Sequence, residues 1–143
     1  MILIGYGSET GTAQATAEYI SRECVYRGVE SKIHPLNDVS IADLQNVGVA
    51  VMVCSTTGDG EEPKNMKSFW RSLLSRSLKG DTFTDLNVAV LGLGDSSYCK
   101  FNYVAKRLYR RLTNLGRHTF TIKLLNAPVP EHNKLFLLKY IIS

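Results

Sequence analysis

The sequence has no long apolar run, few cysteines and no paired metal-binding motif. No apolar stretch reaches the roughly 18 residues that a membrane-spanning helix needs. The first apolar run, residues 1–4, is too short for a secretory signal, so the cytosol is the expected compartment. Cys24, Cys54 and Cys99 are odd in number, widely spaced and outside any C-x-x-C pattern. We expect free thiols in a reducing environment, and neither disulfides nor a zinc site.

Acidic residues are missing from one stretch of the chain. Between residues 100 and 117 there is no acid, while the basic residues there are Lys100, Lys106, Arg107, Arg110, Arg111 and Arg117. The formal net charge is +4, and without these six residues the chain keeps 11 basic and 13 acidic side chains. Like charges four positions apart on a helix cost roughly 0.2–0.5 kcal/mol per pair. If this stretch is a helix, its basic side chains form either a surface for an acidic partner or simply a solvated face. No nucleic-acid-binding signature accompanies it, so a nucleic-acid partner is not expected.

Two common phosphate-binding motifs are absent from the loop at residues 6–13, Tyr-Gly-Ser-Glu-Thr-Gly-Thr-Ala. A P-loop needs Gly-Lys-Ser/Thr, but Thr12 follows Gly11 and the first lysine is Lys32. The dinucleotide pattern G-x-G-x-x-G begins correctly with Gly5 and Gly7, but Thr10 stands at the third glycine. Neither ATP nor NAD is favoured.

The loop nevertheless has the composition of an anion site. It joins an apolar strand to a helix, and the free N–H groups of a helix N-terminus carry about +0.5 of an elementary charge. Hydroxyls of Ser8, Thr10 and Thr12 add donors, and no Lys or Arg lies in the loop. It predicts either a site for a lone phosphate or only a capped helix with Thr10 or Thr12 as N-cap.

The 143 residues are enough for one domain, of which 44% are hydrophobic and 21% charged. Apolar runs predict strands at 2–6, 47–54, 87–93 and 118–125, with a weak edge strand at 30–36. Helical spacing predicts helices from residue 12 to Gly28, around 66–74, and from 104 to Gly116. This alternation predicts an open parallel α/β sheet, whose ligands bind at the carboxyl ends of the strands.

Two other protein classes share this topology, but the residues that their chemistry needs are absent from this sequence. A receiver domain needs acids after the first strand and a phosphorylatable Asp after the third, but Gly5, Tyr6 and Ser55 stand there. A low-mass tyrosine phosphatase needs C-x₅-R, and Gly60 takes the Arg position after Cys54.

Three loops in order resemble the flavodoxin-like FMN domain of the diflavin reductases. The resemblance is strongest to the NADPH-dependent members that feed electrons to cytosolic iron–sulfur assembly. It runs from about residue 2 to residue 122 and is carried by residues 7–13, 56–60, 63–71 and 91–102, which include Gly-Ser-Glu-Thr-Gly-Thr-Ala, Thr-Thr-Gly-Asp-Gly and Leu-Gly-Leu-Gly-Asp-Ser-Ser-Tyr.

The resemblance implies a three-layer α/β/α sandwich with a five-stranded parallel sheet of order 2-1-3-4-5. It implies a phosphate cradle at Ser8–Thr12, a loop against the isoalloxazine edge at Thr56–Gly60, and Tyr98 stacked on the ring. Thr57 stands where many relatives have an aromatic residue, so one ring face is expected to be less covered. The residues implied to contact FMN are Ser8, Glu9, Thr10, Gly11, Thr12, Ala13, Thr56, Thr57, Gly58, Asp59, Gly60, Leu93, Gly94, Asp95, Ser97, Tyr98, Phe101 and Asn102.

The implied activity is oxidoreductase electron transfer without covalent catalysis by side chains and without a metal. Electrons would pass from an FAD/NADPH reductase module through FMN to an iron–sulfur protein of the anamorsin type, or to a haem protein. Acids expected around the ring edge, which would disfavour a reduced anionic flavin, are Asp59, Glu61, Glu62 and Asp95. The alternative is a cofactor-free interaction domain that binds the reductase's partners.

The end of the chain departs from the family pattern. Residues 1–125 are expected to form the flavodoxin-like domain, and 126–143 a divergent tail in which the family's acidic loop and final helix are replaced. The FAD and NADPH modules are also missing, so we expect a truncated or alternatively ended product of a longer reductase.

Overall fold

Five parallel strands form one sheet in the order β2-β1-β3-β4-β5. The computed structural model describes residues 1–57, 60–95, 97, 99–116 and 121–126, the last six by their backbone alone. The strands are β1 (Ile2–Gly7), β2 (Ser31–Pro35), β3 (Val49–Ser55), β4 (Asn87–Gly94) and β5 (Thr121–Asn126). The predicted order is confirmed, and the predicted edge strand at 30–36 is the edge strand β2.

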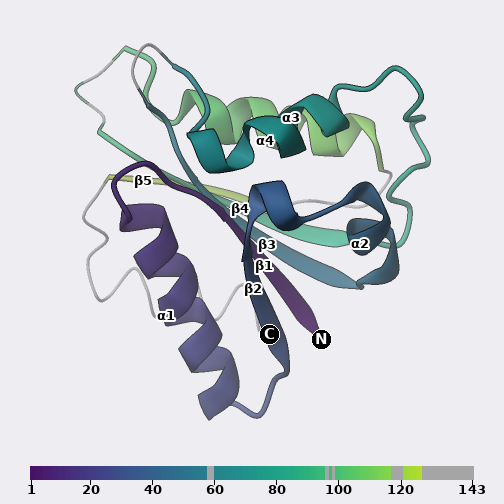
Figure 1. Ribbon diagram of the computed structural model, residues 1–143, viewed down its shortest axis with the longest axis horizontal. Coiled ribbons are helices and arrows are strands. Elements are labelled where there is room, and N and C mark those ends of the chain that lie inside the picture. Colours follow the sequence, from purple (N-terminus) through teal and green to yellow (C-terminus); the bar gives the residue numbers. More distant parts are fainter. Residues whose placement is uncertain (58–59, 96, 98, 117–120, 127–143) are drawn as a thin grey trace.

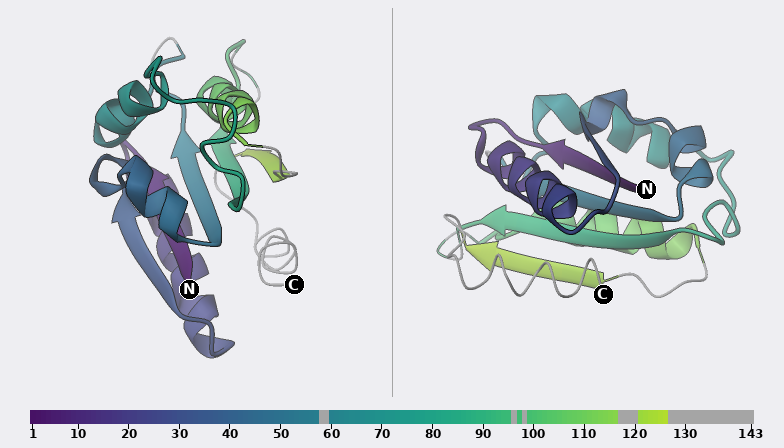
Figure 2. Two further views of the ribbon diagram at one scale, coloured as in Figure 1. Left: turned by 90° about the vertical axis from the view of Figure 1, so that its right-hand side faces the viewer. Right: turned by 90° about the horizontal axis from the view of Figure 1, so that it is seen from below.

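Helices cover both faces of this sheet (Figure 1). One face carries α1 (Thr12–Tyr26), while the other carries α2 (Ile41–Asn46), α3 (Lys67–Leu73) and α4 (Tyr103–Asn114). Two short 3-10 helices, η1 (Leu36–Asp38) and η2 (Lys64–Met66), lead into α2 and α3. The views in Figure 2 show α1 and the α3–α4 pair on opposite sides of the strands. Among the described helices, none is long and apolar enough to cross a membrane.

Alternation along the central strand explains its unbroken apolar run. Val51 and Val53 pack with α1, whereas Ala50, Met52 and Cys54 pack with α3 and α4. Because successive side chains point to opposite faces, a strand covered on both sides must be apolar at every position. Two cores therefore meet at one sheet.

The helix ends follow local rules. Gly28 has φ +69° just after α1, and Val29 N–H bonds to the Cys24 carbonyl at 2.8 Å, so Gly28 ends this helix as expected. The helix α2 was not predicted, because six residues are too few to show a helical period. A reciprocal capping box fixes its start: Asp43 N–H donates to Ser40 Oγ at 3.0 Å, and Ser40 N–H donates to Asp43 Oδ2 at 2.9 Å.

Candidate functional site

The loop between β1 and α1 leaves the helix N-terminus without a side-chain cap. The N-cap is Gly11, with φ +92° in the left-handed region, and no side chain in the described part of the chain caps α1 there. The expected cap by Thr10 or Thr12 is therefore wrong: the loop turns at the one residue without a Cβ. The N–H groups of the first turn of this 15-residue helix thus stay available to an anion.

Contacts from a distant segment hold this loop in place. Ser8 N–H donates to Asn65 Oδ1 at 2.9 Å, and Gly11 N–H donates to Ser8 Oγ at 2.9 Å. A Cβ on Gly7 would overlap Met66 Sδ, so η2 packs directly on the end of β1. Contacts with η2 therefore help to fix the conformation of this loop.

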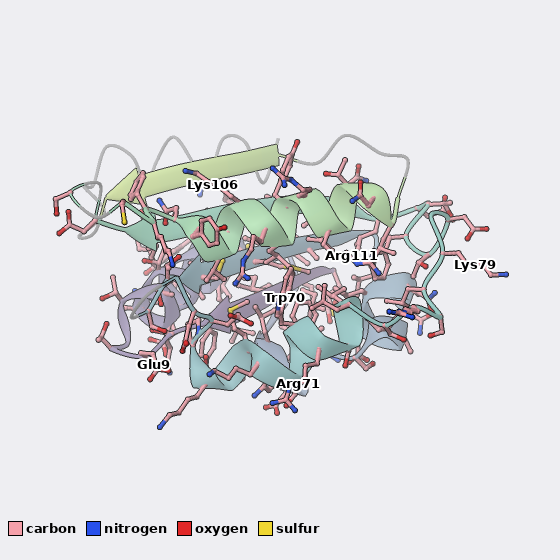
Figure 3. All side chains as sticks on the ribbon, turned by 90° about the horizontal axis from the view of Figure 1, so that it is seen from above. Glu9, Trp70, Arg71, Lys79, Lys106 and Arg111 are labelled. Atoms are coloured by element: carbon pink, nitrogen blue, oxygen red, sulfur yellow. The ribbon has the colours of Figure 1, made fainter. Side chains whose placement is uncertain are left out.

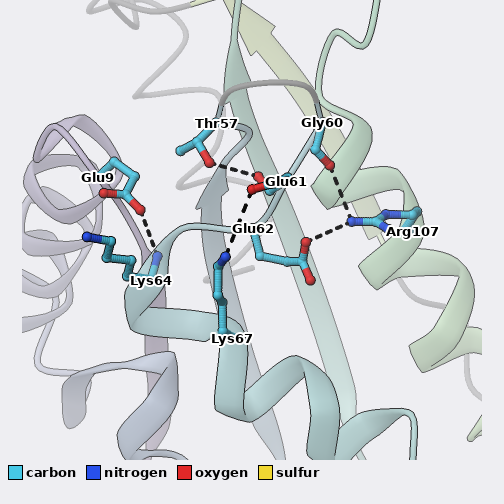
Figure 4. Close-up of polar contacts among 8 residues, drawn as sticks. All are labelled: Glu9, Thr57, Gly60, Glu61, Glu62, Lys64, Lys67 and Arg107. Carbon is cyan, nitrogen blue, oxygen red and sulfur yellow. Dashed lines mark hydrogen bonds and ion pairs between the residues drawn. The ribbon is translucent and has the colours of Figure 1, made fainter.

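The remaining residues of the expected phosphate cradle have unequal roles. Thr10 is exposed and Thr12 half-buried, while Ala13 is fully buried in the core under α1 and offers only its backbone. The Glu9 carboxylate accepts the Lys64 N–H at 2.8 Å (Figure 4). That bond directs its negative charge toward η2.

The loop after β3 closes on itself. Thr57 and Glu61 form an antiparallel bridge, with Thr57 N–H to the Glu61 carbonyl and Glu61 N–H to the Thr57 carbonyl both at 2.9 Å. Thr57 Oγ1 also donates to the Glu61 carbonyl, at 3.1 Å (Figure 4). Val104 N–H donates to Thr56 Oγ1 at 3.1 Å, which ties the base of this loop to the start of α4. Gly58 and Asp59, both expected at the site, lie outside the described residues.

The loop after β4 is organised around Asp95 and Asn102. The Asp95 carboxylate accepts hydrogen bonds from the Ser97 hydroxyl at 2.7 Å and the Ser97 N–H at 2.9 Å, and these bonds lower the pKa of Asp95. The ring of Phe101 is half-buried, with the Lys106 ammonium 5.8 Å from its centroid. Tyr98, the expected stacking residue, lies outside the described residues.

The start of α4, above all Asn102, packs against two glycines at the end of β4. Asn102 is buried, has φ +51° and is the N-cap residue of α4. A Cβ on Gly92 would come within 2.6 Å of Ala105 Cβ and 2.9 Å of Asn102 Oδ1, and one on Gly94 within 3.0 Å of Asn102 Oδ1. Leu93, between them, is buried in the core under α1, so only its backbone faces this edge. Asn102 thus packs closely against the end of β4, and its expected place at the cofactor site stays a prediction.

Two of the acids expected around the ring edge are in ion pairs. Glu62 Oε2 lies 3.1 Å from Arg107 Nη2, and Glu61 Oε2 lies 3.9 Å from Lys67 Nζ (Figure 4). The pair of Glu62 with Arg107 was not predicted, because the two residues are 45 positions apart and no acid lies near Arg107 in the sequence.

Three residues that contact the expected loops were missed by sequence reasoning: Asn65, Met66 and Arg107. Asn65 and Met66 lie in a segment that carries the family resemblance, which was the available signal. The signal for Arg107 was weaker: it stands four positions after Tyr103, the spacing at which two side chains on a helix can touch.

The described geometry fits a phosphate-bearing cofactor such as FMN. An uncapped helix N-terminus and nearby hydroxyls suit a phosphate held by dipoles and hydrogen bonds, and no cation is needed. Two hydrogen bonds join these loops: Ser55 Oγ donates to the Gly7 carbonyl at the end of β1, and Val104 N–H, at the start of α4, donates to Thr56 Oγ1. The loops that follow β1, β3 and β4 thus lie together at the carboxyl ends of the parallel strands.

Comparison with known proteins agrees with this geometry. The family model described as Flavodoxin matches residues 4–135. NADPH-dependent diflavin oxidoreductase 1 from Danio rerio is 50% identical over 115 residues, which cover 80% of this chain and 19% of that protein. The protein of the same name from Schizosaccharomyces pombe is 42% identical over 120 residues, 84% of this chain and 20% of that protein. The chain thus spans about a fifth of the length of these relatives.

Solved structures show the same fold at lower identity. A flavodoxin from Streptococcus pneumoniae TIGR4 superposes with a TM-score of 0.79 at 21% identity, covering 99% of this chain and 94% of that one. Flavodoxin 1 from Bacillus cereus gives 0.75 at 20% identity, with 99% and 94% coverage. With the family model matched over most of its length, the chain belongs to the flavodoxin family.

Proposed function

We propose that this chain binds FMN and is the electron-carrying domain of an NADPH-dependent diflavin reductase. An FAD/NADPH module would deliver the electrons, and an iron–sulfur protein of the anamorsin type, or a haem protein, would accept them in the cytosol. The observation that carries the proposal is the uncapped N-terminus of α1 at the sheet edge where the three loops meet. The identity of 42–50% to diflavin reductases supports it independently.

Each loop has its own task in this proposal. The hydroxyls of Ser8, Thr10 and Thr12 and the first-turn N–H groups of α1 hold the phosphate. The loop at 56–60 meets the edge of the ring, and Tyr98 covers one face. FMN, when bound, supplies the redox chemistry. The protein binds and orients the ring and sets the charge around it.

FMN uptake is the direct test. Purified chain titrated with FMN should quench the flavin fluorescence and turn yellow at a ratio of about one FMN per chain. Protein that stays colourless with excess FMN overturns the proposal and favours a cofactor-free interaction domain.

Two variants test the assignment of the ring face. Tyr98→Ala should lose more FMN affinity than Thr57→Ala, roughly tenfold for a lost stacking contact. Equal losses contradict the role of Tyr98.

A third variant tests the charge at the ring edge. Asp59→Asn should raise the flavin potential, because it removes a negative charge that disfavours the reduced anion. An unchanged potential removes Asp59 from that role.

A further inference from the structure

Arg107 links α4 to the loop after β3 through two acceptors. Its Nη2 lies 3.1 Å from Glu62 Oε2 and 3.4 Å from the Gly60 carbonyl (Figure 4). The Glu62 side chain is 18% exposed and that of Arg107 is 37% exposed. Water therefore screens the pair from the Arg107 side, while the Glu62 carboxylate is the less solvated partner and is left with little hydration if Arg107 is removed.

Two aromatic rings hold the guanidinium in place. Its Cζ lies 5.4 Å from the centroid of Trp70 and 5.2 Å from that of Tyr103. Trp70 lies between α3 and α4 (Figure 3). Cation–π contacts with two rings restrict the guanidinium, and its Nη2 is already directed at the loop.

Gly60 is the residue of the loop whose backbone Arg107 contacts. It is buried with φ +92°, and a Cβ there would come within 2.7 Å of Lys100 Cδ and 3.3 Å of Tyr103 Cδ1. Its N–H donates to the Thr57 carbonyl at 3.1 Å, while its own carbonyl accepts from Arg107. The N–H of Gly60 is therefore held by the loop itself, and its carbonyl by Arg107 on α4.

We propose that Arg107 is a positioning residue that sets the loop for the flavin edge in advance of cofactor binding. It acts through the Gly60 carbonyl and the Glu62 carboxylate and touches no cofactor atom. It also neutralises Glu62 beside the ring edge, so the local field there is less negative than the acidic residues alone predict. The role in cofactor affinity rests on the proposed FMN function; the role in loop order does not.

The same helix provides two matched controls. Arg111, one turn further on, donates from Nε to the Leu73 carbonyl at 2.7 Å and from Nη2 to the Ser75 carbonyl at 3.3 Å. It anchors the end of α3, away from the loop after β3. Arg110 is exposed, so Arg110→Gln removes the same charge from the helix surface.

Amide hydrogen exchange on the apo chain tests the anchor without any flavin. The N–H groups of Thr57, Gly60 and Glu61 are bonded inside the loop, so their exchange reports its opening. In Arg107→Gln these three should exchange roughly tenfold faster, the effect of losing one charge-assisted hydrogen bond. In Arg110→Gln and Arg111→Gln they should keep the wild-type rates, although Arg111→Gln lowers Tm. Unchanged rates in Arg107→Gln, or the same acceleration in Arg111→Gln, overturn the proposal.

Second variants keep the test decisive if Arg107→Gln folds poorly. Glu62→Ala removes the partner on the loop and leaves the contacts of Arg107 with Trp70 and Tyr103 in place, and it should also speed exchange at these amides. Arg107→Lys restores the charge but lacks the planar fork, so it should recover part of the protection. No acceleration in Glu62→Ala contradicts the anchor, and no recovery in Arg107→Lys contradicts a contribution of the positive charge to it.

FMN titration then separates this inference from the proposed function. Arg107→Gln should raise the Kd for FMN roughly tenfold, and Arg111→Gln should leave it unchanged. The midpoint potential of flavin bound to Arg107→Gln should fall below that of Arg110→Gln, because Glu62 is no longer neutralised. If the wild-type chain does not bind FMN, the proposed function fails, and the exchange data alone decide the role of Arg107 in loop order. Wild-type binding with an equal Kd in Arg107→Gln overturns its role in cofactor affinity.

Discussion

Asn65 accepts a hydrogen bond from the backbone N–H of Ser8 at 2.9 Å, although 57 positions separate the two residues. Through this bond, η2 fixes the first residue of the expected phosphate loop. A side-chain amide is well suited here, because its oxygen can accept from the loop without adding negative charge beside an anion.

Asn65→Ala should therefore weaken binding of the phosphate more than binding of the ring. The lost bond is partly buried, so the expected cost is about 1–2 kcal/mol, or roughly tenfold in FMN affinity. Riboflavin, which lacks the phosphate, should bind as it does to the wild type. Parallel fluorescence titrations with FMN and riboflavin provide the measurement.

The control for this change is Asn87→Ala. The Asn87 side chain donates to the Gly48 carbonyl at 3.5 Å, at the amino-terminal end of β4 and so at the other end of the strands from the expected phosphate loop. It should change the affinity for neither flavin. Equal losses of FMN and riboflavin in Asn65→Ala would instead show that Asn65 supports the fold as a whole.

Gly11→Ala should destabilise the domain through backbone conformation alone. Nothing lies within 4 Å of a Cβ built on Gly11, but its φ of +92° is unfavourable for an L-residue by about 1–2 kcal/mol. Gly11→Asn should cost less, because Asn tolerates left-handed φ better. Gly48, equally open but without positive φ, gives the matched control: Gly48→Ala should leave the free energy of unfolding nearly unchanged. Equal effects at Gly11 and Gly48 in urea denaturation would contradict the conformational argument.

The capping box of α2 predicts a pH dependence of stability. Hydrogen bonds from Ser40 lower the pKa of Asp43 below its ordinary value of 3.8. A carboxyl whose pKa is lower in the folded state stabilises that state above its unfolded pKa, and this stabilisation is lost as the pH falls through the folded value. Asp43→Asn should therefore lower Tm at pH 7 and cost progressively less as the pH falls below about 4. A Tm difference that stays constant from pH 7 to pH 3 would show that the charge of Asp43 is irrelevant.

Thiol labelling should distinguish the three cysteines by burial. Cys24 and Cys54 are buried, and burial raises the pKa of Cys54 to about 12, whereas Cys99 is exposed. Because the thiolate is the reactive form, a disulfide reagent at pH 8 should modify Cys99 rapidly and the other two only after denaturation. Cys99→Ser should abolish the rapid phase. A rapid phase that persists in Cys99→Ser would show that one of the buried thiols is accessible.

Sequence pattern alone was sufficient for the sheet and for most of the helices. The apolar run at Val49–Ser55 and the helical spacing of Val104, Leu108 and Leu112 reflect burial, which acts locally and leaves a period in the sequence. The strand order followed from the resemblance, and the structure confirms it. The assignments of Gly58, Asp59 and Tyr98 stay predictions.

What the pattern missed depends on tertiary contacts or on backbone torsion. The Asn65–Ser8 and Glu62–Arg107 contacts join segments 57 and 45 positions apart, and no local period marks such pairs. Gly11 displaced the expected threonine cap because the loop needs a left-handed residue there, and a loop rich in hydroxyls gives no sign of which residue turns. The short helix α2 was missed because a capping box without a period is a weak signal.

The stacking of Trp70 on Arg107 gives the molecule an internal optical reporter. Trp70 is the single tryptophan of the chain and is only 9% exposed. Its indole lies against the guanidinium that anchors the loop after β3, so its emission depends on whether that cation is in place. Ultraviolet emission of the apo chain can thus follow the opening of this loop in real time, with no label attached.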